Sequence, residues 1–598
     1  ELPALLQVLA GRHLPTSYGG DPIKNPDAYP TGRNLYGFDP SRVPTPQAWA
    51  AGKDAAEQLI AEHQRLTGKA PTKLAVSLWS VETMRHQGLL EAQALWLLGV
   101  EPVWDDGGRV TGVKLVPRNV LGRERVDVVL SATGLYRDHF PNAMKQLARA
   151  VQLAAQAQGP GEDGNPVAAH TRSMAAKLRA QGMGEQAALA AAQTRIFSSE
   201  SGNYGTGLDN ATLATDSWQG KKEGDRKLAQ LYLSRMQYAY GPDESTWGSL
   251  PGAAQEGKSG IGGNGGKALN LYAEHLRGTE GAVLSRRSNT YGMLTTDDPF
   301  QYLGGIGLAV RHLDGKAPQL YISNLRATGN GGSGRVEGAA QFLAKELATR
   351  QFHPGYIQGL MKEGYAGTLQ VLDATNNFWG WTAVAREIVR DDQWQEMADV
   401  YVRDKHQLGL KRWFEAHNPH ALAQTMERML EAARQGYWKA DPKTVAELKE
   451  RWRDLAERFD VRSDNARFQA YVGQAPAAHN PAAPAAPGYG LDAPLAQAAP
   501  PAAAQAAAPA PPPPPAEPSQ PTVPPQSVEP PAAEPPAAEP PVVSGLLMAP
   551  VPQAEPVSVG PTQAALLALM LAGITGAGAL RQARRRSVVR PHRIPSLS

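Results

Sequence analysis

Two glycine-rich segments have residue types and spacing that bind phosphate in nucleotide-dependent enzymes. Residues 252–259 (GAAQEGKS) satisfy G-x-x-x-x-G-K-[ST], in which backbone amides and a lysine hold nucleotide phosphates. Such a loop needs a buried strand before it and a helix after it. Residues 241–251 and 260–266 are instead rich in glycine and other turn-forming residues. A flexible glycine-rich loop is the competing interpretation, and we favour it.

Gly329, Gly331 and Gly334 satisfy G-x-G-x-x-G, which can hold the pyrophosphate of a dinucleotide at a helix N-terminus. They follow a predicted strand at 319–323 and precede a predicted helix. Several residues separate the strand from the first glycine, and this segment is generally rich in Gly and Asn. We therefore favour a surface loop here too.

The chain contains no cysteine among its 598 residues, which excludes several classes of chemistry. Disulfides, thiolate zinc sites, iron–sulfur clusters and cysteine nucleophiles all need a thiol. The H-E-x-x-H, G-x-S-x-G and EF-hand patterns are missing as well. Any protein ligand to a metal must therefore be nitrogen, oxygen or the thioether of Met. The formal charge of +3 argues against a protein that coats nucleic acid, since such a protein needs excess Lys and Arg to neutralise phosphates.

Alternating elements predict how the side chains of the body are positioned. Residues 73–79 (KLAVSLW) and 125–132 (RVDVVLSA) are predicted strands, and residues 84–98 between them are a predicted helix. This order is typical of a parallel, Rossmann-like α/β layer, whose ligand crevice lies at the carboxyl ends of the strands. We therefore expect functional side chains at 79–86 and 133–139.

The body is expected to end in a helical region near residue 470. Residues 390–460 have helical periodicity, for example at 421–435 and 442–459. The predicted fold class is thus α/β: a multidomain body with a parallel-sheet layer and a helical C-terminal region, followed by a disordered linker and one transmembrane helix.

The first 45 residues combine Gly, Pro, Asn and Arg without periodicity, as in 31–40 (TGRNLYGFDP). A loop of this length is uncommon inside a compact domain and is usually functional. The chain begins at Glu1 rather than at methionine, which predicts a processed product or a fragment.

Composition changes sharply after residue 473. Residues 474–560 are almost entirely Ala, Pro and small polar residues, which predicts a disordered linker with local polyproline-II structure. Residues 561–580 contain the uncharged run AALLALMLAGITGAGAL, which predicts a transmembrane helix; an amphipathic or buried helix is the alternative. The basic tail, 581–598, carries six arginines, so the positive-inside rule predicts a cytoplasmic C-terminus. The body is then expected on the periplasmic face of a bacterial inner membrane.

Several blocks of this sequence resemble one protein family. Residues 11–44 (GRHLPTSYGGDPIKNPDAYPTGRNLYGFDPSRVP) are similar to the signature segment of the large subunit of cobaltochelatase, CobN, and of the H subunit of magnesium chelatase. One branch of this family is membrane-associated and is found beside genes for haem or cobalamin uptake. Three blocks are most similar to that branch: SRRSNTYG, YVRDKHQLGL and GYWKAD. Further blocks that match in order are LWSVETMRHQG (78–88), EAQALWLLGVEPVWD (91–105), RVDVVLSATGLYRDHFPN (125–142), RIFSSESGNYGTGL (195–208), SRRSNTYGML (285–294), FQYLGGIGLAVRHLDGKAP (300–318), HPGYIQGLMKEGYAG (353–367) and HNPHALAQTMERMLEAARQGYW (417–438).

The resemblance implies that residues 1–470 correspond to the C-terminal part of a chelatase large subunit, with 1–45 as the signature loop and 70–150 as the α/β crevice region. Such a subunit binds a tetrapyrrole and carries the metal-insertion site, while an AAA+ chelatase subunit supplies the ATP-driven step. The implied reaction is insertion of cobalt or magnesium into a porphyrin or corrin ring. The membrane-associated branch implies the alternative of removing iron from imported haem, with membrane proteins of an uptake complex as partners.

The resemblance and the predicted strand ends together indicate candidate catalytic residues. Glu82 and His86 are expected to transfer protons or bind metal, because insertion needs a base for the pyrrole N–H protons and removal needs an acid. Arg137, Asp138 and His139 are expected in the second crevice loop; capping of a helix is the alternative for Arg137 and Asp138.

Within the signature loop, Asp21, Arg33 and Asn34 are expected to shape the loop or to hold the ring carboxylates, for which arginine forks are suited. A purely structural role, pinning a loop, is the alternative for Arg33 and Asp39. The metal ligands are not identified. Weaker candidates are His13, His417 and His420.

Two rival functions follow from the same features. The first is a membrane-tethered protein that binds a tetrapyrrole in an uptake system and performs no chemistry. The second is a structural scaffold, which predicts no tetrapyrrole binding.

Overall fold

The computed structural model describes residues 2–13, 17–18, 34–36, 38–157, 164–249, 269–288, 290–326 and 334–473. The glycine-rich match at 252–259 lies outside these residues, as do the linker, the membrane run and the basic tail after residue 473. Within the described ranges, no helix is both long enough and apolar enough to cross a membrane.

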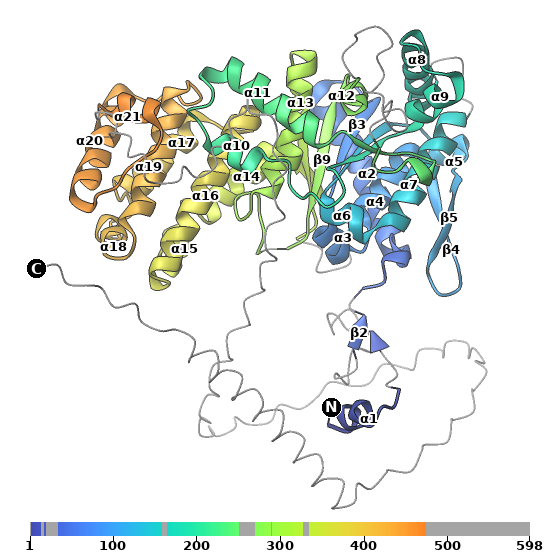
Figure 1. Ribbon diagram of the computed structural model, residues 1–598, viewed down its shortest axis with the longest axis horizontal. Coiled ribbons are helices and arrows are strands. Elements are labelled where there is room, and N and C mark those ends of the chain that lie inside the picture. Colours follow the sequence, from blue (N-terminus) through green and yellow to red (C-terminus); the bar gives the residue numbers. More distant parts are fainter. Residues whose placement is uncertain are drawn as a thin grey trace, which may run out of the picture. The chain divides into compact units, whose positions relative to one another are not determined.

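A seven-stranded mixed sheet forms the centre of the α/β region, in the order β11-β10-β9-β3-β6-β7-β8. Two of its neighbouring strands, β3 and β9, are labelled in Figure 1. The two predicted strands are confirmed as β3 and β6, which pair in parallel, Leu74 with Val128. The two outermost pairs, β10 with β11 and β7 with β8, are antiparallel. The strands are β3 (Lys73–Leu78), β6 (Asp127–Ala132), β7 (Ile196–Ser198), β8 (Tyr238–Tyr240), β9 (Gly281–Arg286), β10 (Gln319–Asn324) and β11 (Arg335–Gly338).

Both faces of this sheet are buried by helices. Because successive side chains of a strand point to opposite faces, each central strand contributes to two cores. Leu74 and Val76 of β3 join one hydrophobic core, whereas Ala75 between them joins the other. The first core includes side chains of α2 (Pro46–Thr67), α4 (Leu89–Leu98) and α7 (Pro141–Gln156). The second core includes side chains of α11 (Gly220–Arg235), α12 (Leu271–Leu276) and α13 (Gly305–Asp314).

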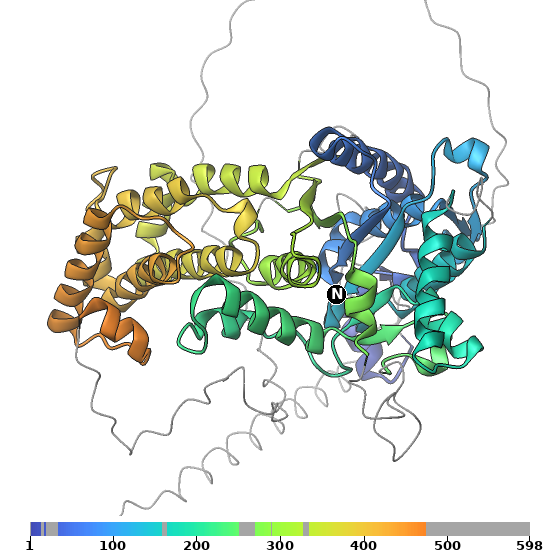
Figure 2. The same cartoon turned by 90° about the horizontal axis from the view of Figure 1, so that it is seen from above.

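The predicted helical region is confirmed, and it begins earlier than the sequence indicated (Figures 1 and 2). Trp379, Trp394 and Trp452 from this region share the second core with the sheet residues Ala75 and Val129. The helices are α14 (Ala339–Thr349), α15 (Pro354–Lys362), α16 (Tyr365–Val384), α17 (Asp391–Met397), α18 (Leu410–His417), α19 (Pro419–Arg434), α20 (Pro442–Phe459) and α21 (Ala466–Val472).

The single helix predicted at 84–98 is wrong, because two helices, α3 (Ser80–His86) and α4, occupy this segment. Gln87 and Gly88 between them have φ values of 56° and 89°, which end α3 in the left-handed region. A Cβ at Gly88 would lie 2.6 Å from Cγ1 of Val43, so this close approach requires glycine. The sequence also missed the hairpin of β4 (Val100–Trp104) and β5 (Val110–Leu115), and α5 (Arg118–Leu121).

The described part of the first 45 residues contains short elements rather than loop alone. They are α1 (Leu2–Leu9) and the parallel pair of β1 (Ser17–Tyr18) and β2 (Asn34–Tyr36). Of the second glycine pattern, Gly334 is described and leads directly into strand β11. The pattern therefore lacks the helix N-terminus that dinucleotide binding requires. The remaining helices are α6 (Gly134–His139), α8 (Pro166–Ala180), α9 (Glu185–Gln193) and α10 (Leu208–Leu213).

Candidate functional site

The carboxyl edge of the sheet has a topological switch point between β3 and β9. From β3 the chain adds β6, β7 and β8 on one side, and it then returns to place β9, β10 and β11 on the other side. In open α/β sheets, ligands bind in the crevice at such a reversal. Trp79 follows β3 at this point, and Arg286 ends β9.

Glu82 and His86, both on α3, are buried and bonded to residues at the end of β9. Glu82 Oε1 accepts a hydrogen bond from Arg85 Nη1 (2.6 Å), and Oε2 accepts one from the backbone N–H of Arg287 (2.7 Å). His86 Nδ1 accepts from the first backbone N–H of α4 (3.0 Å), so Nε2 carries the proton and lies 3.0 Å from Ser285 Oγ. Burial lowers the pKa of His86 to about 3, so the imidazole is neutral at neutral pH.

Arg137 and Asp138 join α6 to the loop that follows β7. Arg137 Nη1 donates to the carbonyl oxygens of Ser199 (2.8 Å) and Glu200 (2.7 Å), while Nε donates to Asp138 Oδ1 (2.7 Å). The hydroxyl of Tyr204, in the same loop, donates to Asp138 Oδ2 (2.7 Å). Although burial acts against them, the hydrogen bonds from Arg137 and Tyr204 lower the pKa of Asp138. In this arrangement Arg137 is engaged by protein groups.

His139 completes the set that the sequence placed in this crevice. Its Nδ1 lies 2.8 Å from Ser80 Oγ, which connects α6 to the start of α3. The hydroxyl of Thr133 caps α6, and a Cβ at Gly134 would lie 2.7 Å from the carbonyl oxygen of Asn203. The first turn of α6 therefore packs directly on the loop after β7.

The structure thus brings five of the eight predicted site residues to one edge of the sheet. Asp21 and Arg33 lie outside the described residues. Asn34 begins β2, where it pairs with Ser17 of β1. The catalytic and binding roles of all eight stay predictions. The weaker candidates lie after α1 (His13), at the end of α18 (His417) and in α19 (His420).

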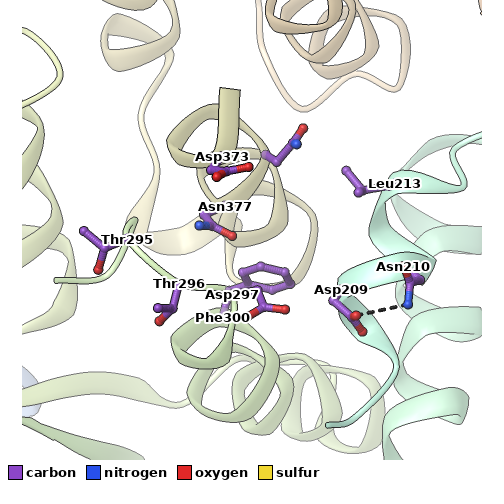
Figure 3. A pocket seen from close by; sticks show the side chains of 10 residues that line it. Asp209, Asn210, Leu213, Thr295, Thr296, Asp297, Phe300, Asp373 and Asn377 are labelled. Atoms are coloured by element: carbon purple, nitrogen blue, oxygen red, sulfur yellow. Dashed lines mark hydrogen bonds between the residues drawn. The ribbon is translucent and has the colours of Figure 1, made fainter. Parts of the chain in front are cut away.

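An acidic cavity of about 450 Å³ lies between α10, α16 and the segment leading into a π-helical turn, η4 (Phe300–Gly304). Figure 3 shows Asp209 and Asp297 approaching this cavity from opposite walls, with Asp373 above them in that view. Eight of the ten residues that line it have polar side chains, Asp209, Asn210, Thr295, Thr296, Asp297, Asp373, Asn376 and Asn377, and the other two are Leu213 and Phe300.

Asp209, Asp297 and Asp373 line this cavity, and Asp298 follows Asp297 in the chain; we call these four residues the aspartate cluster. Burial, with the charge of Asp297 second, raises the pKa of Asp298 to about 6. Burial also raises the pKa of Asp209 and of Asp373, and Asp297 adds to both shifts. A carboxylate that titrates near neutral pH can accept and release a proton there. Within the described ranges, no group of three or more His, Asp or Glu side chains has the arrangement of a metal site.

Gln301 connects the cavity to the loop after β7. Its Nε2 donates to Asp297 Oδ2 (2.9 Å), and its Oε1 accepts from both the backbone N–H and the hydroxyl of Thr206 (3.0 Å each). Arg137 holds the same loop a few residues earlier. The crevice predicted from the sequence and the acidic cavity therefore share one supporting segment.

Sequence reasoning missed the aspartate cluster and Arg286. Asp297 and Asp298 are adjacent acids ahead of an apolar helical segment, and this was the one local signal for the cluster. Asp209 and Asp373 join them only through tertiary packing, so no spacing in the sequence predicts the cavity.

Comparisons with known proteins agree with this architecture. The family model described as CobN/Magnesium Chelatase matches residues 1–445. The H subunit of magnesium chelatase from Cereibacter sphaeroides is 31% identical over 462 residues, covering 77% of this chain and 35% of that protein. The CobN subunit of aerobic cobaltochelatase from Pseudomonas aeruginosa is 32% identical over 440 residues, covering 73% and 33%.

Among solved structures, the catalytic subunit of cobaltochelatase from Mycobacterium tuberculosis matches with a TM-score of 0.63 and 30% identity, over 76% of this chain and 36% of that one. The chain thus spans about a third of the length of these relatives. Because the family model covers well over half of its residues, the chain belongs to the CobN/magnesium chelatase family.

Proposed function

We propose that this chain is the metal-handling part of a tetrapyrrole chelatase large subunit, which inserts magnesium or cobalt into a porphyrin or corrin ring. The observation that carries this proposal is the cavity lined by Asp209, Asp297 and Asp373, which shares a supporting loop with the crevice, in a chain similar to proteins named as magnesium-chelatase and cobaltochelatase subunits. A cavity lined by one sign of charge raises the local concentration of the opposite ion. A divalent metal substrate would therefore be drawn to this place.

Metal insertion also releases protons, and the cluster suits that step. Two pyrrole N–H protons leave the ring when a divalent metal enters it. Asp298 is the best candidate to accept a proton, because its pKa of about 6 lies close to neutral pH. Glu82 and His86 are already bonded to backbone and side-chain groups, so their part in the reaction is to hold the crevice in shape.

The nucleotide-driven step is assigned to a separate AAA+ subunit. A phosphate loop at 252–259 would need a buried strand directly before it. Strand β8 ends at Tyr240 and is followed by a 3-10 turn at Glu244–Thr246. This separation supports an ATPase partner rather than nucleotide binding by this chain.

The finer proposal is that the chain belongs to a membrane-anchored branch that works on imported rings, including removal of iron from haem. Its support is the sequence: an uncharged run at 561–580, a proline-rich linker before it and arginines after it. The body would then face the periplasm of a bacterial inner membrane. A reporter fused after Ser598 is expected to be active only in the cytoplasm, and activity only in the periplasm would overturn this orientation.

The chelatase proposal is tested by spectral titration of the full chain with a metal-free porphyrin and with a metalloporphyrin, with and without an AAA+ partner. We expect a shifted absorption band on ring binding and a change of metallation in the complete mixture. Asp298→Asn should keep ring binding and lose metallation by about 100-fold or more, the usual contribution of a general base.

Asp392→Asn is the matched control, since Asp392 is an exposed carboxylate paired with Arg390 in the helical region. It should leave both readings unchanged. A shifted band with no change of metallation under any condition would support the tethered binding protein instead. No shift at all would contradict both proposals and leave the scaffold.

A further inference from the structure

Four exposed apolar or aromatic side chains lie just beyond the carboxyl ends of four neighbouring strands. Val81 comes three residues after β3, and Leu135 comes three residues after β6. Tyr204 is in the loop after β7, and Tyr291 is in the segment after β9. Their exposed fractions are 36%, 42%, 57% and 38%, in that order. Because these strands are parallel, their carboxyl ends meet at one edge of the sheet, and the four side chains share that edge.

Contacts between α3, α6 and the loop after β7 place three of these side chains next to one another. Ser80 Oγ, at the start of α3, lies 2.8 Å from Nδ1 of His139 on α6, and Figure 1 shows the two helices side by side. A Cβ at Gly134 would lie 2.8 Å from Cδ1 of Tyr204. The Tyr204 ring therefore packs on the turn of α6 that carries Leu135.

Arg85 joins the fourth side chain, Tyr291, to the same group. Its guanidinium carbon lies 4.5 Å from the centroid of the Tyr291 ring, and its side chain is 26% exposed. Val81 lies four residues before Arg85 on α3, so both side chains are on one side of that helix. We call Val81, Leu135, Tyr204 and Tyr291, together with Arg85, the edge surface.

The grouping of these side chains, rather than any one of them, indicates a binding surface. Single exposed apolar residues are common on proteins and need no explanation. The edge surface instead collects side chains from four separate segments at the place where open α/β sheets bind their ligands. A ligand that covers it has to be broad and largely apolar.

Charge is unevenly distributed along the edge surface. At the Tyr291 end, residues 80–86 and 285–291 include three arginines, Arg85, Arg286 and Arg287, and one acid, Glu82. At the Tyr204 end, residues 134–139 and 199–205 include one arginine and two acids. A ligand with carboxylates on one side would therefore bind with that side at the Tyr291 end.

Arg286 strengthens the positive end from beneath. It is 0% exposed, and its guanidinium carbon lies 4.5 Å from the ring centroid of Trp79, the residue after β3. Among the described residues, its Nε, Nη1 and Nη2 have no hydrogen-bond partner. By contrast, the buried Arg195 donates to Asp127 at 2.9 Å. No hydrogen-bonded carboxylate within the described ranges thus neutralises Arg286, and its charge adds to that of Arg85.

We propose that the edge surface binds one face of the tetrapyrrole, with the carboxylate side of the ring at Arg85 and turned away from Asp138 and Glu200. This inference rests on the proposed function, and it adds where the ring lies and how it is oriented. A tetrapyrrole is broad, flat and apolar on its faces and carries carboxylates at its rim. The flat face of a guanidinium stacks on an aromatic ring while its edge recognises a carboxylate, so contact with Tyr291 is compatible with this role of Arg85.

The same placement connects the ring to the acidic cavity. Tyr204 belongs to the loop after β7, and the hydroxyl of Thr206 in that loop donates to Gln301 Oε1 (3.0 Å). Gln301 in turn donates to Asp297 at the cavity (2.9 Å). One loop would then support both the ring and the place where the metal is drawn.

The first experiment measures ring binding alone, by absorption titration of the full chain without metal and without an AAA+ partner. The probes are protoporphyrin IX, which has two carboxylates, and its dimethyl ester, in the same detergent. Val81→Ser combined with Leu135→Ser should weaken binding of both probes by about 10-fold or more, because the ring would cover the exposed apolar area of both side chains.

Leu189→Ser is the matched control, since Leu189 is 45% exposed on α9, the helix that leads into the amino end of β7. It should leave both affinities unchanged. The thermal midpoints of all these variants should stay close to that of the unmodified chain, because the substituted side chains are exposed. If the double variant does not fold, Leu135→Ser alone replaces it.

Arg85→Gln tests the orientation of the ring. It should weaken binding of protoporphyrin IX by about 10-fold, the usual contribution of a hydrogen bond to a charged group, and leave binding of the dimethyl ester unchanged. A general disturbance of α3 would instead weaken both probes equally, and that result would overturn the role of Arg85.

The remaining outcomes separate this inference from the proposed function. If the unmodified chain binds the ring and neither Arg85→Gln nor the serine variants alter the affinity, the edge surface is overturned and another protein segment covers it, while chelation stands. If these variants weaken binding but the complete mixture with metal and an AAA+ partner never metallates the ring, chelation fails and the edge surface stands. If the unmodified chain binds neither probe, both fail.

Discussion

Replacing Arg137 tests whether this side chain holds the crevice together or binds the substrate. It is only 6% exposed, and its Nη1 donates to two backbone carbonyl oxygens, of Ser199 and Glu200. Hydrogen bonds to a charged group contribute about 1.5–3 kcal/mol each, and two that share one nitrogen add incompletely. The ion pair with Asp138 adds little, because that carboxylate is 35% exposed. We therefore expect Arg137→Met to lower the free energy of unfolding by about 3 kcal/mol.

The assay is urea denaturation of the two proteins at one pH, followed by porphyrin titration well below the midpoint of unfolding. Asp138→Asn is the matched control and should cost about 1 kcal/mol or less. The loop after β7 also carries Thr206, whose hydroxyl donates to Gln301, and Gln301 in turn donates to Asp297. We therefore expect both hydrogen bonds to weaken when Arg137 no longer holds this loop. A variant as stable as the unmodified chain that no longer binds porphyrin would refute the reasoning and identify Arg137 as a substrate-binding residue.

Three further changes test other parts of the site. Gly134→Ala should destabilise the chain by about 1–3 kcal/mol, because its Cβ would lie 2.7 Å from the carbonyl oxygen of Asn203; an unchanged thermal midpoint would contradict that packing. Because the pKa of His86 is lowered in the folded state, the unfolded chain binds a proton at this imidazole at a higher pH than the folded chain does. The free energy of unfolding should therefore fall as pH drops from about 6.5 towards 3, and His86→Gln should flatten this part of the stability–pH profile. Arg311→Met should cost about 3–5 kcal/mol because it removes the arginine paired with Glu387 and one of the two arginines that hold Asp225. Arg286→Met should cost less or stabilise, and equal losses in urea would show that Arg286 has a structural partner.

The central strands could be predicted because they are buried on both faces. Largely apolar runs such as 73–79 and 125–132 are typical of parallel strands, and the helical segment predicted between them fits the crossover that a parallel pair needs. The break between α3 and α4 had one local signal, Gly88 after the polar residues 85–87, which the prediction of one continuous helix did not use. The glycine that ends α3 is set by contact with Val43, which lies far away in the sequence.

The candidate site was predictable only where its residues follow a predicted strand. Glu82 and Arg137 lie just after β3 and β6, so a rule about strand ends found them. Asp209 and Asp373 lie on helices whose sequences have no unusual pattern, and they meet Asp297 only when the helical region packs against the sheet. Arg286 ends a strand that the sequence analysis did not identify, and its missing hydrogen bonds are visible only in three dimensions.

The position of β9 beside β3 also affects how the chain folds. Leu74 pairs with Gly281, although β6, β7, β8 and most of the surrounding helices lie between them in the sequence. Closing such a long loop is entropically costly, and contacts of large sequence separation slow folding. We expect β3, β6 and their helices to associate early and the pairing with β9 to come late. During synthesis the growing chain would then expose one side of β3 until β9 emerges, and pulse-labelled hydrogen exchange should show the amides of β9 gaining protection after those of β6.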